Sequence, residues 1–125
     1  ITLRLEGRKE TLIGVDTSRD ALEIARENSE RYETDIEWVE ADGMPFVQGF
    51  QKPFIVVSNP PYIPEGTKLP KDVQEYEPQK ALFAGPKGLD VLLPLVSAAK
   101  VNPHCTGIVL ECRDDQVEAV LTQST

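Results

Sequence analysis

Four consecutive residues, Asn59, Pro60, Pro61 and Tyr62, could together hold a planar NH2 group for chemistry at its nitrogen. The Asn59 side-chain carbonyl can accept one N–H of such a group, and the main-chain carbonyl of Pro60 can accept the other. Each proline fixes φ at about −65° and lacks a backbone N–H, so the turn is rigid and presents carbonyls without competing donors. The Tyr62 ring can lie against a flat acceptor. The pattern therefore indicates a site that aims a nitrogen at an electrophile, a task in which positioning does most of the catalysis.

Residues 59–62, here called the NPPY loop, are also typical of an ordinary turn, because Asn and Pro are common turn residues. The position of the loop favours the functional interpretation. It directly follows the apolar run FIVVS at 54–58, which predicts a buried strand. Ligands of open α/β sheets bind at the carboxyl ends of the strands.

Three acidic residues are further candidates for the site. Asp16 follows the apolar run 11–15, where a doubly wound fold places an acid that accepts both ribose hydroxyls of an adenosine-containing cofactor; a helix N-cap is an equally good interpretation. Asp42 could accept the exocyclic amino group of adenine, although a polar turn before Gly43 is slightly favoured for this residue alone. Glu77 could hydrogen-bond the acceptor or brace the loop, with solvated surface charge as the alternative.

The elements that position these residues follow from hydrophobic patterning. Four short apolar runs predict strands, at 11–15, 36–39, 54–57 and 107–110. Three of them are nearly continuous, as expected for a parallel sheet covered on both faces. Helical patterns are predicted at 19–32, at about 89–101 and from about 115 onward. This alternation predicts a doubly wound, mostly parallel α/β sheet with right-handed crossovers.

The stretch 58–88 has no clear period and holds six of the ten prolines. Loops of this length are usually functional or disordered. Because prolines stiffen the stretch and apolar residues punctuate it, we expect an ordered lid.

Bulk composition narrows the class of protein. With 125 residues, 40% hydrophobic and 27% charged, the chain is typical of one soluble globular domain. The net charge of −8 disfavours direct binding to nucleic acid, which normally requires a basic face. No apolar run approaches the roughly 20 residues needed to cross a bilayer, so no membrane association is expected. The expected location is the cytoplasm or an organellar matrix. Cys105 and Cys112 form no C-x-x-C pair, so reduced thiols are expected rather than a metal site.

Three stretches, VSNPPYIPEG (57–66), YEPQKALFAG (76–85) and GLD (88–90), resemble the HemK-type release-factor glutamine methyltransferases. The likeness extends over nearly the whole chain. The tetrapeptide of the NPPY loop alone is shared with adenine-N6 and guanine-N2 methyltransferases of nucleic acids. The YIPEG and EP-x-x-AL stretches that follow it favour the protein-glutamine family.

The resemblance implies an S-adenosyl-L-methionine-dependent methyltransferase built on a seven-stranded sheet. It implies that Asp16 binds the ribose of this cofactor, that Asp42 lies near the adenine, and that Asn59 also belongs to the cofactor site. No metal ion is implied.

The same resemblance implies that the acceptor is the side-chain amide of a glutamine in a protein. The residues around that amide would be Asn59, Pro60, Pro61, Tyr62 and Glu77, with Asn59, Pro60 and Tyr62 as the catalytic set. The substrate would be the Gly-Gly-Gln loop of a peptide chain release factor.

The chain departs from the family at both ends. It opens at ITLRLEG, without the Gly-rich cofactor loop that follows the family's first strand, and it ends soon after the strand at 107–110. Residues 1–125 are therefore expected to be a partial methyltransferase catalytic domain that lacks the Gly-rich loop and the final strands. For residues 1–5, the family likeness predicts a helix, whereas the alternation of apolar and polar residues predicts a strand.

Two other functions stay open from the sequence. One is a nucleic-acid methyltransferase that uses the NPPY loop on an adenine or guanine base flipped out of its stack. The other is a non-catalytic fragment that has lost cofactor affinity together with the Gly-rich loop.

Overall fold

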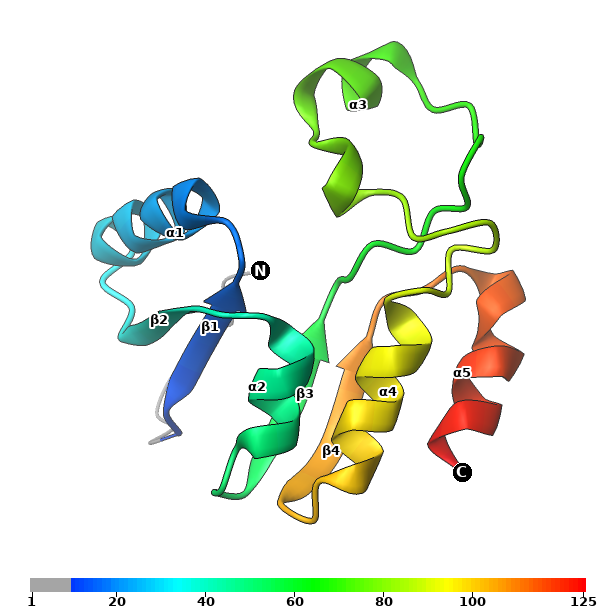
Figure 1. Cartoon of the computed structure of the whole chain (residues 1–125). Helices are drawn as coiled ribbons and strands as arrows, with labels where there is room; N and C mark the ends of the chain where they lie inside the picture. Colours follow the sequence, from blue (N-terminus) through cyan, green and yellow to red (C-terminus); the bar gives the residue numbers. More distant parts are fainter. Residues whose placement is uncertain (1–9) are drawn as a thin grey trace. The chain divides into compact units, whose positions relative to one another are not determined.

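The computed structural model describes residues 10–125, which form two compact units (Figure 1). One unit ends at Gly43, and the other runs from Met44 to Thr125. Each is built around its own pair of parallel strands. None of the helices found in residues 10–125 is long and apolar enough to cross a membrane.

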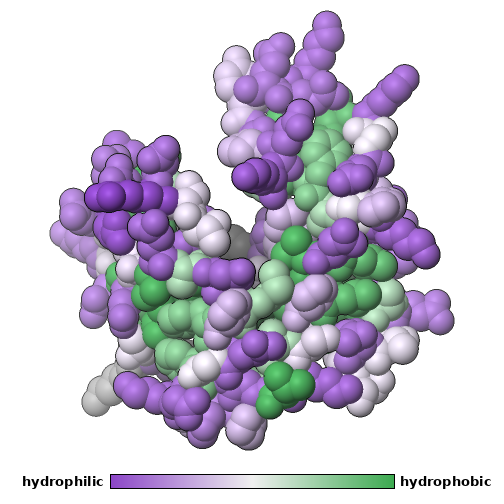
Figure 2. Space-filling view, viewed as in Figure 1, coloured by the Kyte–Doolittle hydropathy of each residue, from purple (hydrophilic) through white to green (hydrophobic). Residues whose placement is uncertain are grey.

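The first unit is a strand-helix-strand arrangement of β1 (Leu12–Asp16), α1 (Arg19–Arg31) and β2 (Ile36–Glu40). The two strands pair in parallel, residue by residue from first to last. A parallel pair needs a long crossover, and α1 supplies it. Helix α1 contacts both strands and buries Leu22, which is 1% exposed, while hydrophilic residues cover most of its outer side (Figure 2).

Helix α1 begins and ends at local signals in the sequence. The hydroxyl of Ser18 accepts a hydrogen bond from the Ala21 N–H at 3.2 Å, which makes Ser18 the N-cap. At the other end, Glu33 has φ of +50°, the left-handed conformation in which a glycine usually terminates a helix. The N–H of Thr34 then returns to the carbonyl of Ser29 at 2.9 Å. The chain thereby reverses direction into β2.

A tryptophan fixes how α1 meets the sheet. The indole Nε1 of Trp38 donates a hydrogen bond to Ser29 Oγ at 3.0 Å. The Trp38 ring lies so close to Gly14 that a Cβ at position 14 would overlap it. The glycine in the middle of β1 therefore makes room for the indole of the neighbouring strand.

The second unit consists of two strands and three longer helices, with further short helical turns. The strands and longer helices are α2 (Gly43–Gly49, beginning at the boundary between the units), β3 (Phe54–Ser58), α4 (Leu92–Val101), β4 (Cys105–Leu110) and α5 (Val117–Ser124). Strands β3 and β4 pair in parallel, with Val56 opposite Ile108 and Ser58 opposite Leu110. Helix α5 packs against α4.

The core of the second unit lies between one face of the β3–β4 pair and the helices α2 and α4 (Figure 1). Its buried residues are Val47, Val56, Leu95, Ala98 and Ala99. The opposite face of the strand pair is also apolar but uncovered: Ile55, Val57 and Val109 are 61%, 47% and 59% exposed. Strands that are apolar on both faces are typical of a parallel sheet.

Asn102, which follows α4, holds the end of α2 in place. Its side chain is 4% exposed, and Nδ2 donates to the carbonyls of Val47 at 2.6 Å and Phe50 at 2.9 Å. The Oδ1 atom accepts from the His104 N–H at 2.9 Å. The last carbonyls of a helix have no hydrogen-bond donors within the helix, so the buried Asn102 amide serves as their donor.

The segment that connects β3 to α4 is ordered at its base by backbone pairing. Ile63 forms a parallel bridge with Phe83, through an Ile63 N–H to Leu82 carbonyl bond of 2.9 Å and an Ala84 N–H to Ile63 carbonyl bond of 3.0 Å. Between the paired stretches lie the short helix α3 (Lys71–Tyr76) and a turn of 3₁₀ helix at 79–81. The prediction of an ordered segment is confirmed, and its role as a lid stays a prediction.

The predicted strands all form within two residues of their expected bounds, and both pairs are parallel. The fold is thus mixed α/β with short parallel sheets, while a seven-stranded doubly wound sheet stays a prediction. Helices α2 and α3 were not expected, α4 begins at 92 rather than about 89, and the last helix starts with a 3₁₀ turn at 114–116. Both cysteines are free thiols, and Cys112 lies beyond the last residue of β4. The alternatives for residues 1–5 lie outside the described residues.

Candidate active site

The NPPY loop begins where β3 ends, beside the carboxyl end of β4. Ser58 is the last residue of β3, and its carbonyl accepts a hydrogen bond of 3.1 Å from the N–H of Glu111. This bond continues the ladder one step past the strands, so Asn59 and Glu111 leave the sheet at the same edge. The prediction that the loop lies at a strand edge is therefore confirmed.

Asn59 and Pro60, the first two residues of the NPPY loop, differ in exposure. Pro60 is buried, whereas Asn59 is exposed. Within residues 10–125, the Asn59 side-chain amide makes no hydrogen bond. Asn59 is therefore not a turn brace, and its carbonyl is available to an external N–H donor.

Tyr62 is held through its hydroxyl, which donates a hydrogen bond to Glu111 Oε1 at 2.6 Å. This hydrogen bond raises the pKa of the Tyr62 hydroxyl above its ordinary value of 10.0, and the negative charges of Glu111 and Glu77 raise it further. Tyr62 consequently stays a neutral phenol at physiological pH.

The main chain of Tyr62 is held by a second residue from the segment after β4. Gln116 is 3% exposed, and its Nε2 donates to the Tyr62 carbonyl at 2.8 Å and to the Lys87 carbonyl at 3.0 Å. A longer contact of 3.3 Å reaches the carbonyl of Gly88. Gly88 has φ of +69°, and a Cβ on it would overlap the Tyr62 carbonyl oxygen. Tyr62 is thus fixed at both ends, and its surroundings are closely packed.

The two acids expected at the cofactor lie in the first unit, at one edge of the β1–β2 pair. Asp16 ends β1, and its main-chain carbonyl accepts a bond of 3.0 Å from the N–H of Ala41, which precedes Asp42. The Asp16 carboxylate is exposed, and its Oδ1 accepts from the Ser18 N–H at 2.7 Å. Because Ser18 is the N-cap of α1, the N-cap interpretation of Asp16 is wrong.

An exposed carboxylate at the end of a parallel strand fits a ribose diol, whose two hydroxyls both donate hydrogen bonds. One oxygen of Asp16 is oriented by Ser18, and the carboxylate as a whole faces solvent. Asp42 is likewise exposed. Both residues therefore have the chemistry that an adenosine group requires, and their assignment to the cofactor stays a prediction.

The structure brings together two groups of predicted residues, each within its own unit. Asp16 and Asp42 share one edge of the first unit. The NPPY loop lies in the second unit, and Glu77, which is exposed and follows α3, lies in the same unit. Sequence reasoning missed Gln116, and it noted Glu111 only as a polar strand end. The sole signal for Gln116 was an uncharged polar residue among acidic neighbours, which does not predict burial.

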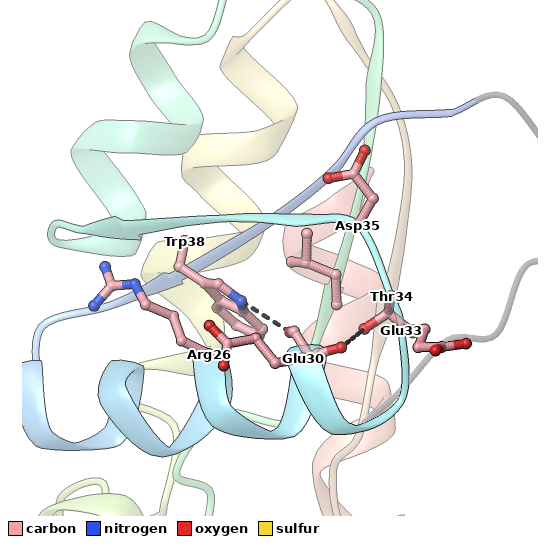
Figure 3. Close-up of a pocket in the computed structure, with 8 residues that line it drawn as sticks. Arg26, Glu30, Glu33, Thr34, Asp35 and Trp38 are labelled. Carbon is pink, nitrogen blue, oxygen red and sulfur yellow. Dashed lines mark hydrogen bonds between the residues drawn. The ribbon is translucent and has the colours of Figure 1, made fainter.

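The first unit also carries a shallow depression of about 370 Å³ between the second half of α1 and the start of β2 (Figure 3). Its rim includes Arg26, Glu30 and Asp35, and its floor the indole of Trp38. It lies at the amino end of β2, whereas Asp16 and Asp42 lie at the carboxyl ends of the strands. The depression is thus separate from the predicted cofactor residues.

No family model matches the chain. Curated proteins do match it. A release factor glutamine methyltransferase of Bacillus anthracis is 40% identical over 93 residues, which are 72% of this chain and 33% of that protein. A protein of the same name from Mycolicibacterium smegmatis is 42% identical over 93 residues, covering 70% of this chain and 32% of the relative. One from Bacillus subtilis is 36% identical over 110 residues, covering 81% and 38%.

The chain spans about a third of the length of these curated relatives. Sequence identity exceeds one third of the aligned positions in all three cases. The NPPY loop and its flanking motifs predicted a relationship to this family. Over most of its length, the chain is therefore homologous to the release factor glutamine methyltransferases.

Proposed function

We propose that the protein transfers a methyl group from S-adenosyl-L-methionine to the side-chain amide nitrogen of a glutamine in a peptide chain release factor. The observation that carries the proposal is Asn59, an exposed amide without a partner in residues 10–125, directly after the last residue of strand β3. The names of the relatives support the same acceptor. The net charge of −8 favours a protein over a nucleic acid as the substrate.

The NPPY loop has the groups to orient a glutamine amide. The Asn59 Oδ1 accepts one N–H of the acceptor NH2 and the Pro60 carbonyl accepts the other, so the nitrogen is fixed in space. Drawing both hydrogens toward carbonyl oxygens raises the electron density on a nitrogen whose lone pair is otherwise delocalised into the amide. Holding the nitrogen in line with the methyl carbon is the main catalytic contribution of the chain.

Tyr62 supplies a flat, neutral surface beside the acceptor. Its hydroxyl is committed to Glu111 at 2.6 Å, so the ring rather than the hydroxyl is offered to the substrate. The raised pKa of Tyr62 keeps the phenol protonated, and no tyrosinate charge forms near the reacting amide.

S-adenosyl-L-methionine supplies an electrophilic methyl group when it is bound. In this proposal, the Asp16 carboxylate accepts the ribose hydroxyls, and Asp42 accepts the adenine amino group. Their placement at the edge of the β1–β2 pair supports these roles, since ligands of such sheets collect at the carboxyl ends of the strands. Asn59, in the second unit, serves the acceptor amide in this proposal.

The test is a methylation assay with cofactor carrying a labelled methyl group. The protein is incubated with a release factor, with the same factor carrying Gln→Ala in its Gly-Gly-Gln loop, and with duplex DNA and RNA as alternative acceptors. Label on the unaltered factor and none on its Gln→Ala variant supports the proposal. Label that persists on the Gln→Ala variant, or appears only on nucleic acid, refutes it.

The role of Asn59 is tested in the same assay with a matched asparagine. Asn59→Ala removes one of the two acceptors and lowers kcat by about 100-fold, the loss typical of a misplaced reacting group. Asn28→Ala alters an exposed asparagine on α1 and leaves the rate within about twofold. Equal rates for the two variants would remove Asn59 from the mechanism.

A further inference from the structure

We propose that Gln116 is a positioning residue that fixes the NPPY loop for catalysis by holding the main chain of Tyr62. The proposal rests on the proposed function, because it assigns Gln116 a part in the methyl transfer made by that loop. The proposal is based on the buried side-chain amide of Gln116, whose Nε2 donates both to the Tyr62 carbonyl in the NPPY loop and to the Lys87 carbonyl in a second turn.

The orientation of the Gln116 amide is set by its own backbone turn. Gln116 closes the 3₁₀ turn at 114–116, and its Oε1 accepts a bond of 3.1 Å from the Arg113 N–H. Its backbone N–H in turn donates to the Arg113 carbonyl at 3.0 Å. These reciprocal bonds fix which end of the amide faces inward, so the Nε2 atom points at the neighbouring carbonyls.

The acceptors of Gln116 belong to segments far apart along the chain. The Tyr62 carbonyl lies 54 residues before Gln116, and the Lys87 carbonyl 29 residues before it. One amide therefore joins the NPPY loop to the turn that leads into α4. A side chain with two N–H donors is required to hold both carbonyls, and at 3% exposure water does not compete for them.

The same segment after β4 also holds the other end of Tyr62. Glu111 accepts the Tyr62 hydroxyl at 2.6 Å, and Gln116 donates to the Tyr62 carbonyl at 2.8 Å. With its hydroxyl and its carbonyl both fixed, the Tyr62 ring has one orientation relative to the end of β3. Proline fixes φ of Pro60 and Pro61, and ψ of Pro60 is restricted because a proline follows it, so fixing Tyr62 also limits the direction of the Pro60 carbonyl.

A purely structural role for Gln116 predicts a different pattern from a positioning role. If the residue only stabilised the fold, its loss would lower the melting temperature and the amount of active protein, but not kcat of the molecules that remain folded. If it positions the loop, kcat falls in folded protein while cofactor affinity is kept. The two roles are therefore separable by experiment.

The test compares Gln116→Met with Gln123→Met in the complete protein. Methionine keeps the length of the side chain and removes both donors. Gln123 lies on α5, where its amide donates to the Ser97 hydroxyl, remote in sequence from the NPPY loop. For each variant, kcat and KM for the release factor, the dissociation constant of S-adenosyl-L-methionine by calorimetry, and the melting temperature are measured.

Gln116→Met is expected to lower kcat by about ten- to a hundredfold. The cofactor dissociation constant should change by no more than about twofold, because the two acids proposed to bind the cofactor, Asp16 and Asp42, belong to the first unit and not to the NPPY loop. A stabilising osmolyte that restores the melting temperature should not restore kcat. Gln123→Met should keep kcat within about twofold of the wild type. Unchanged kcat in folded Gln116→Met, or recovery of kcat with the melting temperature, overturns the proposal.

Amide hydrogen exchange gives a readout that needs no activity. The Ile63 N–H, bonded to the Leu82 carbonyl at 2.9 Å, should exchange faster in Gln116→Met and at an unchanged rate in Gln123→Met.

If the wild type methylates no release factor, the proposed function fails while exchange at Ile63 still tests whether Gln116 fixes the loop. If Gln116→Met does not fold, Gln116→Glu, which keeps an acceptor for Arg113, is used. Failure of both to fold assigns Gln116 to stability alone and overturns the proposal.

Discussion

Replacing Gly88 by alanine tests the packing around the NPPY loop without substituting any residue of the loop. Gly88 has φ of +69°, a conformation that costs an L-amino acid about 1–2 kcal/mol. A Cβ at this position would also overlap the Tyr62 carbonyl oxygen and approach the Gln116 amide. Relieving that overlap moves the carbonyl away from its donor, and a buried polar group that loses its hydrogen bond costs about 1–3 kcal/mol.

Gly66→Ala is the matched control for this substitution. Gly66 has φ of +79°, so an alanine there carries a similar backbone cost. No other atom lies within 4 Å of the Cβ that would be added. The control therefore loses about 1–2 kcal/mol, whereas Gly88→Ala loses about 2–5 kcal/mol. The difference between the two variants isolates the contact with Tyr62 and Gln116.

The assay is urea unfolding of both variants and the wild type, followed by far-ultraviolet circular dichroism and extrapolated linearly to water. We expect Gly88→Ala to be less stable than Gly66→Ala by about 1–3 kcal/mol. Equal free energies of unfolding would mean that the Tyr62 carbonyl is not packed against position 88. In that case the fixed orientation of the NPPY loop would lose its structural basis.

Three further predictions concern single contacts. Glu111→Gln keeps an acceptor for the Tyr62 hydroxyl but removes a negative charge, so spectrophotometric titration should show the pKa of Tyr62 falling toward 10.0. Because the pKa of Tyr62 is raised in the folded state, the contribution of this group to stability is present below pH 10.0 and is lost as the pH rises through the folded value. An unchanged titration of Tyr62 would contradict the assignment. Glu33→Gly places a glycine at φ of +50° and should raise the free energy of unfolding by about 1 kcal/mol, with a loss of stability as the contrary result. Asn102→Ala leaves the Val47 and Phe50 carbonyls without their buried donor, so the free energy of unfolding should fall by about 3 kcal/mol and the melting temperature should fall with it. Scanning calorimetry measures both changes. A fall below about 0.5 kcal/mol would show that water replaces the amide.

The strands could be predicted because their signal is local. Runs such as FIVVS at 54–58 are apolar on successive residues, which is typical of a strand in a parallel sheet. Within residues 10–125 only one face of β3 is buried, since Ile55 and Val57 are 61% and 47% exposed. The position of Asn59 at a strand end followed directly. Its exposure, which makes it available as an acceptor of hydrogen bonds, did not follow from the sequence.

The helices that were missed depend on partners remote in the sequence. Helix α2 contains Gly43, Pro45 and Gly49, three residues with poor helix propensity, and its last carbonyls are held by Asn102. A local pattern cannot report a cap supplied from more than 50 residues away. Helix α3 has six residues and buries none of them, so it lacks the apolar stripe by which helices are recognised.

The supports of the candidate site were hidden for the same reason. Gln116 follows Asp114 and Asp115 in an acidic stretch, which in the sequence indicates a solvated surface. Its burial arises only because the segment after β4 returns to the NPPY loop. The residues expected to do chemistry could be identified from the sequence, whereas those that hold them in place required the structure.

The contact between Trp38 and Gly14 gives the protein a built-in optical reporter. Trp38 is the only tryptophan in the chain, and its half-buried indole packs against Gly14 of β1 and donates to the Ser29 hydroxyl of α1. Its fluorescence emission should therefore shift to longer wavelength when the first unit opens. Comparing emission with circular dichroism during denaturation would show whether the two units melt as one cooperative body or in sequence.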